Sequence, residues 1–350
     1  MLSPTVFRDL VSGRKQGWAP SVLRAMLRTV AVPYGWGMGW RNGRYDSRRA
    51  EIISVDVPVI SVGNLTLGGT GKTPLVEWLG RLLRGQDLRV AIVSRGYGAQ
   101  EGARNDEALE LELALPGVPH IQQPDRVEAA RAAIAEMKSQ VILLDDGFQH
   151  RRLARDLDIV LLDATEPWGF GHIFPRGTLR EPLSGLARAR VVVLSRADML
   201  NSAARAAIRT RVAQLAPEAL WCEVEHGPQS LLTPAGETLP LSALRGERVA
   251  AFCGIGNPAG FRHTLDALGT NIAAWREFPD HHVYTPEDVE SLAQWGSSAD
   301  RMLCTRKDLV KLREAALGKV QLSALSIQLV FLAGRAELEE MVQGLSRQVT

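Results

Sequence analysis

The segment 63–73 has the composition of a phosphate-binding loop. It follows an apolar run, precedes a helical pattern and reads Gly63, Asn64, Leu65, Thr66, Leu67, Gly68, Gly69, Thr70, Gly71, Lys72, Thr73. Glycines let successive backbone N–H groups curl around phosphate oxygens, and the helix that follows adds its positive N-terminal dipole. In such loops the lysine reaches the β- and γ-phosphates, and the next hydroxyl binds Mg²⁺. The strict motif has glycine where this chain has Thr66, and we expect Gly68 and Gly69 to compensate.

Two adjacent carboxylates, Asp145 and Asp146, end the apolar run 141–144. If this run is a strand beside the one before the glycine loop, both carboxylates lie at the edge where phosphates bind, and a carboxylate there can hold Mg²⁺. Neighbouring side chains at a strand end point in different directions, so one can bind the metal while the other supports it. The loop and the acidic pair together predict phosphoryl transfer from a Mg²⁺-nucleotide.

The sequence leaves two classes of protein open at this point, a kinase with a hydroxyl substrate and a regulatory NTPase or metallochaperone switch. Ser195-Arg196-Ala197-Asp198 is weakly similar to the base-reading loop of GTPases, but the Asn and Lys of that loop are replaced. A weaker alternative is dinucleotide binding at Gly254, Gly256 and Ala259, a spacing that is common by chance.

The elements that must position these residues follow from the alternation of apolar runs and helical patterns. Helices are expected at 74–83 and 127–138, and strands at 57–62, 89–93, 141–144, 159–162 and 191–194. Continuous apolar strands that alternate with helices indicate an α/β fold with a doubly wound parallel sheet covered on both faces. Ligands of such sheets bind beyond the carboxyl ends of the strands. We therefore expect a P-loop NTPase-like core.

A second, smaller α/β domain is expected after a short β linker near 225–245, where Gly and Pro interrupt the pattern. Strands are predicted at 249–253 and 302–304, and helices at 260–268 and 336–345. The predicted domains are an N-terminal segment 1–50, a kinase core 51–225, and the linker with the smaller domain 226–350. Cys222, Cys253 and Cys304 stand far apart, which favours small buried side chains over disulfides or a zinc site.

The N-terminal segment is basic and aromatic. Residues 1–50 carry nine Lys and Arg against Asp9 and Asp46, a net charge of +7. The spacing of apolar residues predicts an amphipathic helix over 20–32, and the glycine-interrupted aromatic stretch 32–40 is not expected to be regular helix. Two interpretations remain, a helix packed on the domain and an interfacial membrane contact. The chain contains no apolar run of about 18 residues, so no membrane-spanning helix is predicted.

Several motifs, in order from about residue 60 to 310, resemble the tetraacyldisaccharide 4′-kinase (lipid A 4′-kinase) family. They are Ser61–Thr66 running into Gly68–Pro74, Ser94-Arg95-Gly96-Tyr97-Gly98, Asp145-Asp146-Gly147-Phe148-Gln149-His150-Arg151, Phe174–Pro182, Cys253–Pro258 and Phe278–His282. The resemblance implies transfer of the ATP γ-phosphate to the 4′-hydroxyl of a tetraacylated glucosamine disaccharide 1-phosphate, a lipid A precursor. It also implies two α/β/α sandwiches joined by a two-stranded linker.

The resemblance further implies the roles of individual residues. The catalytic pair would be Asp106, in Asn105-Asp106-Glu107-Ala108, and His281, with Lys72 acting on the transferring phosphate. The metal and nucleotide shell would comprise Thr73, Asp145, Asp146, Gln149, His150 and Glu181, and Arg95, Arg151, Arg176 and Arg180 are plausible phosphate partners. The family works with Mg²⁺ at the cytoplasmic face of the bacterial inner membrane. We therefore expect peripheral membrane contact through residues 1–45, no nucleic-acid partner and no obligatory protein partner.

Overall fold

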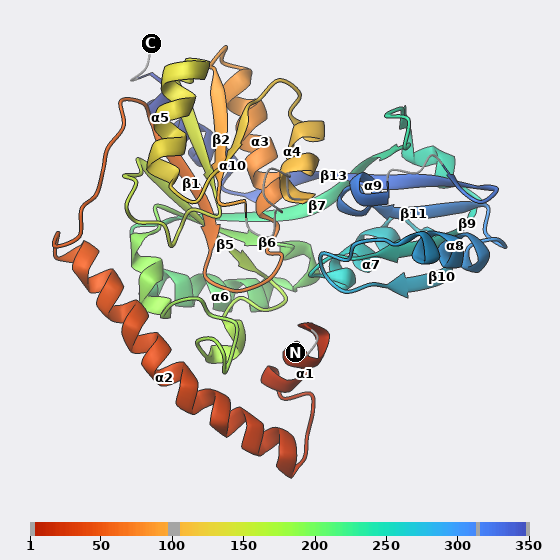
Figure 1. Ribbon diagram of the computed structural model, residues 1–350, viewed down its shortest axis with the longest axis horizontal. Coiled ribbons are helices and arrows are strands. Elements are labelled where there is room, and N and C mark those ends of the chain that lie inside the picture. Colours follow the sequence, from red (N-terminus) through yellow and green to blue (C-terminus); the bar gives the residue numbers. More distant parts are fainter. Residues whose placement is uncertain (1–3, 97–105, 313–315, 348–350) are drawn as a thin grey trace. The chain divides into compact units, whose positions relative to one another are not determined.

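The computed structural model of the chain describes residues 4–96, 106–312 and 316–347, which divide between two units (Figure 1). The first unit comprises residues 1–104, 114–225 and 331–350, and the second comprises 105–113 and 226–330. The predicted phosphate-binding loop and acidic pair belong to the first unit. Asp106 and His281 both belong to the second.

The first unit is built on a parallel sheet with the strand order β7-β6-β5-β1-β4-β2-β3. In the register, Val62 of β1 pairs with Asp145 of β4, and Asn64 pairs with Leu161 of β5. The strands are β1 (Val59–Asn64), β2 (Val90–Ser94), β3 (His120–Gln122), β4 (Val141–Asp145), β5 (Leu157–Asp163), β6 (Val191–Ser195) and β7 (Leu220–Leu232). Because the strands run parallel, the ends of β1 and β4 meet at one edge of the sheet.

Helices cover this sheet, and every residue of β1, β4 and β5 is buried. Helix α5 packs its alanines against β2 and β4, and α6 packs Ile208 and Val212 against β5 and β6. The prediction of a doubly wound parallel α/β fold is confirmed. The helices of this unit are α1 (Pro4–Val11), α2 (Trp18–Asp46), α3 (Lys72–Arg84), α5 (Arg126–Met137), α6 (Ser202–Leu215), α10 (Arg335–Ser346) and the 3₁₀ turns Gly169–Gly171, Leu183–Arg188 and Ala197–Met199.

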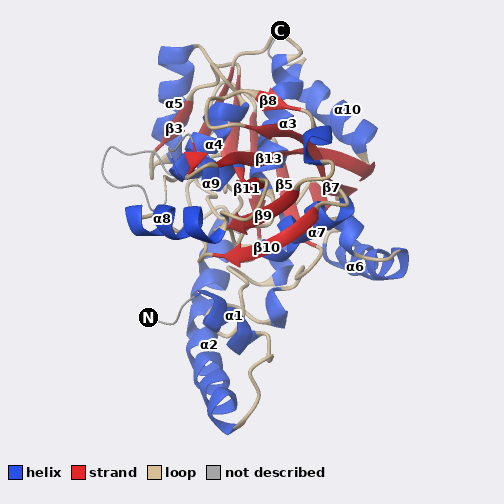
Figure 2. Cartoon of the chain, turned by 90° about the vertical axis from the view of Figure 1, so that its right-hand side faces the viewer, coloured by secondary structure: helices blue, strands red, loops and turns tan. Residues whose placement is uncertain are grey.

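The second unit has a smaller sheet in which the strands β10-β9-β11-β13 run parallel, and the short strands β12 and β8 pair antiparallel with β13 and β7. Alternate residues of β9 face two cores: Val249 and Ala251 pack with α7, and Ala250 and Phe252 pack with α8. Figure 2 shows these helices beside β9 and β10. The elements are β8 (Thr238–Leu239), β9 (Arg248–Cys253), β10 (Asn271–Glu277), β11 (Arg301–Thr305), β12 (Ala316–Leu317), β13 (Val320–Ala333), α4 (Asp106–Ala114), α7 (Pro258–Ala267), α8 (Pro286–Trp295), α9 (Arg306–Leu312) and a 3₁₀ turn at Leu241–Leu244.

The region predicted as an interrupted linker begins as a continuous strand. Strand β7 runs through His226-Gly227-Pro228 from the first unit into the second, and β13, its neighbour in the strand order, returns to the first. A Cβ on Gly227 would lie 2.7 Å from Cγ2 of Val330. This glycine therefore permits the close approach of the two strands and does not break the strand.

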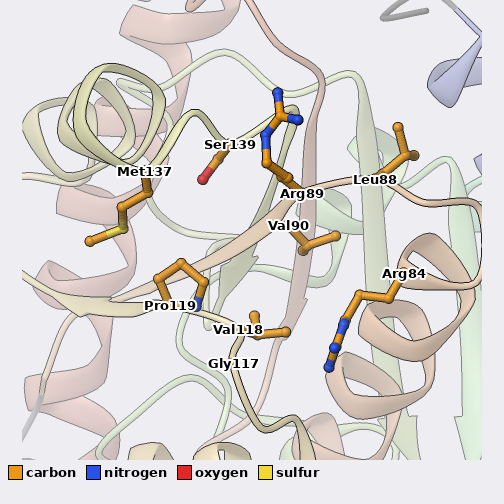
Figure 3. A pocket seen from close by; sticks show the side chains of 9 residues that line it. All are labelled: Arg84, Leu88, Arg89, Val90, Gly117, Val118, Pro119, Met137 and Ser139. Carbon is orange, nitrogen blue, oxygen red and sulfur yellow. The ribbon is translucent and has the colours of Figure 1, made fainter.

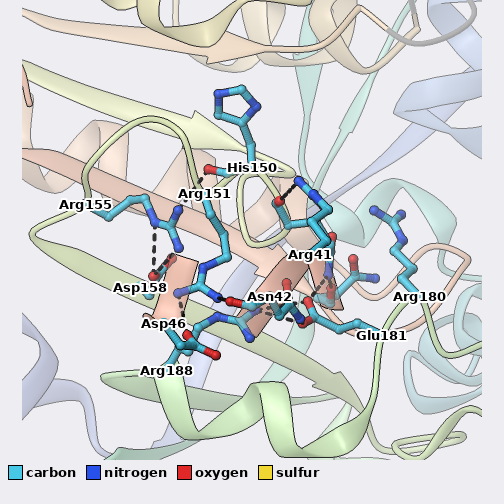
Figure 4. A network of polar contacts seen from close by, with 12 residues as sticks. Arg41, Asn42, Asp46, His150, Arg151, Arg155, Asp158, Arg180, Glu181 and Arg188 are labelled. Atoms are coloured by element: carbon cyan, nitrogen blue, oxygen red, sulfur yellow. Dashed lines mark hydrogen bonds and ion pairs between the residues drawn. The ribbon is translucent and has the colours of Figure 1, made fainter. Parts of the chain in front are cut away.

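The expectation that 32–40 is irregular is wrong, because α2 is one helix of 29 residues that includes Pro33 and four glycines. Contacts with later segments of the same unit hold the second half of α2. Asn42 donates a hydrogen bond to Oε2 of Glu181 at 2.7 Å, and Arg41 donates one to the backbone oxygen of Gln149 at 2.6 Å (Figure 4). Tertiary contacts thus offset the low helix propensity of glycine. None of the described helices has the length and apolar character needed to cross a membrane.

Candidate functional site

The glycine loop joins the end of β1 to the start of α3, as predicted. Gly68 has φ 110° and Gly71 has φ 86°, values that favour glycine. Thr66 stands in a short antiparallel bridge with Leu179, and Leu67 donates its N–H to the backbone oxygen of Thr178 at 2.7 Å. Because Thr66 occupies an extended, buried position, glycine is not needed there. This is the physical reason for the departure from the strict motif.

Arg196 follows β6, two strands away from β1 in the sheet, and its side chain braces the loop. Its guanidinium donates to Oδ2 of Asp163 at 2.6 Å and to the backbone oxygen of Gly69 at 3.1 Å. The side chain is about nine-tenths buried. The segment Ser195–Asp198 therefore supports the glycine loop, a role that explains Arg196 without a base-reading function.

Lys72 and Asp146 form an ion pair at the edge of the sheet. Nζ of Lys72 lies 3.3 Å from Oδ1 of Asp146 and 3.4 Å from Oδ1 of Asn64. Arg180 donates to both oxygens of the same carboxylate, at 2.9 and 2.7 Å. Burial alone would raise the pKa of Asp146, but the charges and hydrogen bonds of Lys72 and Arg180 hold it well below its ordinary value. Asp146 is thus ionised and clamped between two cations.

Asp145 has a different environment. It is the last residue of β4 and is buried, whereas about a third of the Asp146 side chain is exposed. Asp146 also adopts the left-handed conformation, with φ 52°. The backbone turn after the strand therefore directs the second carboxylate toward Lys72 and leaves the first in the sheet.

Two of the remaining predicted metal-shell residues, Glu181 and Gln149, are held by protein contacts, and Figure 4 shows Glu181 among its neighbours. Glu181 is fully buried and binds Arg188 at 2.9 Å, and Gln149 Nε2 donates to Oε1 of Glu181 at 3.0 Å and to the backbone oxygen of Asn64 at 2.9 Å. Thr73 is half-buried in the first turn of α3. Burial, together with the charges of neighbouring arginines, lowers the pKa of His150 to about 4. Across the described residues, no three His, Cys, Asp or Glu side chains come together as a metal site.

The four candidate phosphate arginines occupy different environments. Arg151 binds the backbone oxygen of Asn42 and Oδ1 of Asp46, and Arg176 binds the backbone oxygen of Val11. Both therefore fasten N-terminal helices to the core. Arg180 clamps Asp146, and Arg95 directly follows β2 at the carboxyl edge of the sheet. Tyr97 and Gly98 of the same motif lie outside the described residues.

Sequence reasoning missed Arg126, which the structure places near Asp145 and Asp146 at the carboxyl edge of the sheet. It begins α5, is buried, and donates to the backbone oxygen of Pro124 at 3.2 Å. Burial and the charge of Arg95 lower the pKa of its guanidinium, whereas Asp146 and Asp145 act in the opposite direction. The sequence feature that could have identified Arg126 is its place as the first residue of α5, shortly after β3.

The second unit contains the predicted Asp106–His281 pair. Nδ1 of His281 lies 3.4 Å from Oδ2 of Asp106, and Nζ of Lys311 lies 3.0 Å from the same oxygen. His281 has φ 59°, a conformation that strains a non-glycine residue. Partial burial would raise the pKa of Asp106, but hydrogen bonds from His281 and Lys311 and the lysine charges lower it. Asn105 of this motif lies outside the described residues.

The glycine segment 254–258 is explained by packing. The N–H of Gly254 donates to Oδ1 of Asp308 at 3.0 Å, and a Cβ at this position would lie 3.3 Å from Cβ of His282 and from the backbone oxygen of Pro279. Asn257 caps α7 through Gly260. These contacts explain why position 254 is a glycine, and no bound dinucleotide is needed to account for it.

Two further features lie outside this chemistry. The three cysteines are free and buried, as predicted, and burial raises the pKa of each thiol.

A pocket of about 270 Å³ opens near the start of β2 and the last turns of α3 and α5, at the edge of the sheet away from the glycine loop (Figure 3). It is lined by Arg84, Leu88, Arg89, Val90, Gly117, Val118, Pro119, Met137 and Ser139.

A phosphate-binding loop at the carboxyl edge of a doubly wound sheet, with its lysine paired to an aspartate from the neighbouring strand, defines the class of P-loop nucleotide-binding proteins. A family model described as Tetraacyldisaccharide-1-P 4'-kinase matches residues 23–347. The chain belongs to this family and is a kinase, which confirms the resemblance found in its motifs. The alternative of a regulatory switch is not favoured.

Relatives and a solved structure agree with this assignment. The Tetraacyldisaccharide 4'-kinase of Anaeromyxobacter sp. (strain K) is 42% identical over 312 residues, 84% of this chain and 82% of the relative. That of Syntrophus aciditrophicus is 38% identical over 332 residues, 87% of this chain and 88% of the relative. The crystal structure of "apo" form LpxK from Aquifex aeolicus in complex with ATP matches with a TM-score of 0.73 and 30% identity, and covers 92% of this chain and 99% of that one.

Proposed function

We propose that this chain transfers the γ-phosphate of ATP to the 4′-hydroxyl of a tetraacylated glucosamine disaccharide 1-phosphate. The observation that carries the proposal is the glycine loop with Lys72 held against Asp146, in a chain whose relatives are named for this reaction. The similar solved structure from Aquifex aeolicus is a complex with ATP, which supports ATP as the nucleotide. In the step, the sugar oxygen bonds to the γ-phosphorus, the bond from that phosphorus to the ADP oxygen breaks, and the hydroxyl proton leaves.

The first unit binds the nucleotide in this proposal. Backbone N–H groups of 68–73 and the N-terminus of α3 surround the phosphates, and Lys72 stabilises charge on the γ-phosphate. Thr73, Asp145 and Asp146 offer the hard oxygen ligands that suit Mg²⁺, with Glu181, Gln149 and His150 in support. Bound Mg²⁺ would supply charge neutralisation on the phosphate oxygens. Because Mg²⁺ keeps waters and phosphate oxygens as ligands, the site needs only a few protein donors.

The second unit supplies the proton acceptor. Asp106 takes the proton of the 4′-hydroxyl, and His281, in contact with the same carboxylate, orients and supports it. Phosphoryl transfer through a loose transition state needs positioning more than a strong base, so a carboxylate with a lowered pKa is adequate. The exposure of His281, about half of its side chain, leaves the pair accessible to a substrate.

The N-terminal segment would hold the protein at the cytoplasmic face of the inner membrane. In α2, Trp18, Trp36 and Trp40 are 82%, 75% and 68% exposed. Val22, Met26 and Val30, which recur at helical spacing and would be buried if this helix packed on the domain, are more than half exposed as well. An exposed apolar stripe with arginines beside it suits a headgroup boundary and an acylated substrate. The kinase core 51–225 and the smaller domain 226–350 complete the proposed organisation.

A single assay tests the reaction. The purified protein is incubated in detergent with Mg²⁺-ATP and tetraacyl disaccharide 1-phosphate, and the lipid is analysed by mass spectrometry. We expect a product heavier by one phosphate, and an Asp106→Ala variant slower by roughly 10²- to 10³-fold with nearly unchanged ATP affinity. Absence of a phosphorylated lipid overturns the proposal. Normal turnover of Asp106→Ala overturns the assignment of the base.

A further inference from the structure

Helix α9 presents two lysines on one face. The chain has only six lysines, and two of them, Lys307 and Lys311, are four residues apart in α9. Residues at this spacing are neighbours on the same side of a helix. The side chain of Lys311 is 7% exposed and that of Lys307 is 14% exposed. Lysines are almost never this buried unless an acidic partner compensates the loss of water.

Each lysine faces one member of the Asp106–His281 pair. Nζ of Lys311 lies 3.0 Å from Oδ2 of Asp106. Nζ of Lys307 lies 3.4 Å from Nε2 of His281 and 3.5 Å from Oδ1 of Asp280. Nδ1 of His281 points to the same oxygen of Asp106 that Lys311 contacts. The four side chains therefore form a chain of contacts that runs from Lys307 through His281 and Asp106 to Lys311.

The donor chemistry of this arrangement fixes where the proton on the ring lies. An ammonium group can only donate hydrogen bonds, so the ring nitrogen that faces Lys307 must accept. His281 then carries its proton on Nδ1 and donates it to Asp106. Over the described part of the chain, the contacts of the Asp106 carboxylate all fall on Oδ2. This leaves Oδ1 to receive the proton of a substrate hydroxyl.

The helix that carries the lysines is anchored from its other side. Asp308 is fully buried and accepts hydrogen bonds from the N–H of Gly254 at 3.0 Å, from Tyr284 at 3.0 Å and from Thr305 at 2.6 Å. Leu309 and Leu312 pack into the core beside β11. A helix fixed by three hydrogen bonds and two leucines holds Lys307 and Lys311 in place.

We propose that Lys311 and Lys307 are positioning residues for phosphoryl transfer, Lys311 by orienting the Asp106 carboxylate and Lys307 by fixing His281 as the Nδ1–H tautomer. This rests on the proposed function, in which Asp106 is the base. The lowered pKa of Asp106 agrees with the contact, because partial burial alone would raise it. Neither lysine needs to touch the substrate for this role.

A double-mutant cycle tests Lys311. We expect Lys311→Met to lower kcat about 10- to 100-fold with little change in KM for ATP, and Lys311→Arg to recover part of that loss. In an Asp106→Asn background, the same change should cost less than about threefold, because the group it acts through is already lost. Lys319→Met, which removes an exposed lysine of the same unit, is the control and should match the parent protein.

An equal loss from Lys311→Met in both backgrounds would overturn the role of Lys311, since a purely structural effect is additive. Failure of the proposed function looks different: the parent protein would then form no phosphorylated lipid, and if only the assignment of the base is wrong, Asp106→Asn alone would keep normal turnover. Thermal unfolding of each variant identifies those that do not fold, and in that case Lys311→Arg alone is carried through the cycle.

The tautomer of His281 tests Lys307 without any activity. ¹⁵N spectra of the histidine-labelled full chain, recorded at a pH about two units above the ordinary histidine value of about 6.5, distinguish protonated from unprotonated ring nitrogens. The signals of His281 are assigned by their loss in His281→Gln. We expect protonated Nδ1 in the parent protein, and a shift toward the other tautomer in Lys307→Met but not in Lys319→Met. A parent ring protonated on Nε2, or unchanged signals in Lys307→Met, would overturn the proposal.

Discussion

Lys72 Nζ lies 3.3 Å from Oδ1 of Asp146, so the lysine of the glycine loop is already neutralised by a carboxylate from the neighbouring strand. Arg180 binds the same carboxylate. The phosphates of a nucleotide must therefore compete with the Asp146 carboxylate for Lys72, unless a bound cation neutralises that carboxylate first. This contact gives Asp146 two opposite effects on nucleotide binding, which depend on whether Mg²⁺ is present.

The first prediction separates these two effects. Without Mg²⁺, Asp146→Asn should bind ATP several-fold more tightly than the parent protein, because Lys72 and Arg180 are released and a repelling charge is removed. With Mg²⁺, the same variant should bind more weakly, because a metal ligand is lost. Titration calorimetry in EDTA and in Mg²⁺ measures both. Asp56→Asn, which changes an exposed carboxylate before β1, is the control. An equal loss of ATP affinity in Asp146→Asn with and without Mg²⁺ would contradict the expectation.

The second prediction concerns Gly63, the next-to-last residue of β1, which precedes the glycine loop. A Cβ on Gly63 would lie 2.6 Å from Cβ and 2.8 Å from the backbone nitrogen of Phe148, which is fully buried. Gly63→Ala should therefore lower the free energy of unfolding by about 1–3 kcal/mol. Gly69→Ala is the matched control, since nothing lies within 4 Å of its Cβ position. Chemical denaturation of both variants decides, and equal stabilities would show that Phe148 moves without cost.

The chemistry at the edge of the first sheet was predictable because it depends on where strands end. Continuous apolar runs identify buried parallel strands, and the residue after such a run must lie at the carboxyl edge. This is why Lys72 and Asp146 could be expected near each other from sequence. The environment that separates Asp145 from Asp146 could not, because it depends on the left-handed turn at Asp146.

Contacts between residues far apart in sequence account for what was missed. Local propensity argues against a helix through Pro33 and its neighbouring glycines, and only contacts such as Asn42 with Glu181 reverse that preference. The pairing of Asp106 with Lys311 spans about two hundred residues and leaves no local pattern. No strand was predicted over 320–333, where β13 carries the chain back to the first unit.

The third prediction concerns stability and pH. The pKa of His150 is lowered to about 4 in the native protein by burial and by Arg126 and Arg155, whereas an unfolded histidine titrates near 6.5. As the pH falls from about 6.5 to 4, the unfolded state binds a proton that the native state does not, so stability falls by up to about 3 kcal/mol. His150→Gln should lack this part of the decline. Denaturation of both proteins in EDTA across this range tests it, and parallel curves would contradict it.

The fourth prediction tests the membrane contact of α2 without removing the helix. Deletion of the segment would also remove Arg41 and Asn42, which bind the core beside the glycine loop, so a loss of binding or activity could not be assigned to the membrane. Substitution of the exposed aromatic residues avoids this. Trp36→Ser with Trp40→Ser should weaken binding to anionic vesicles at least about tenfold, because each indole loses apolar contact with the headgroup boundary while the packed side of the helix is unchanged. Val283→Ser, which removes an exposed apolar side chain of the second unit, should bind as the parent does. Vesicle sedimentation measures all three proteins, and binding by the double variant equal to that of the parent would contradict the contact through α2.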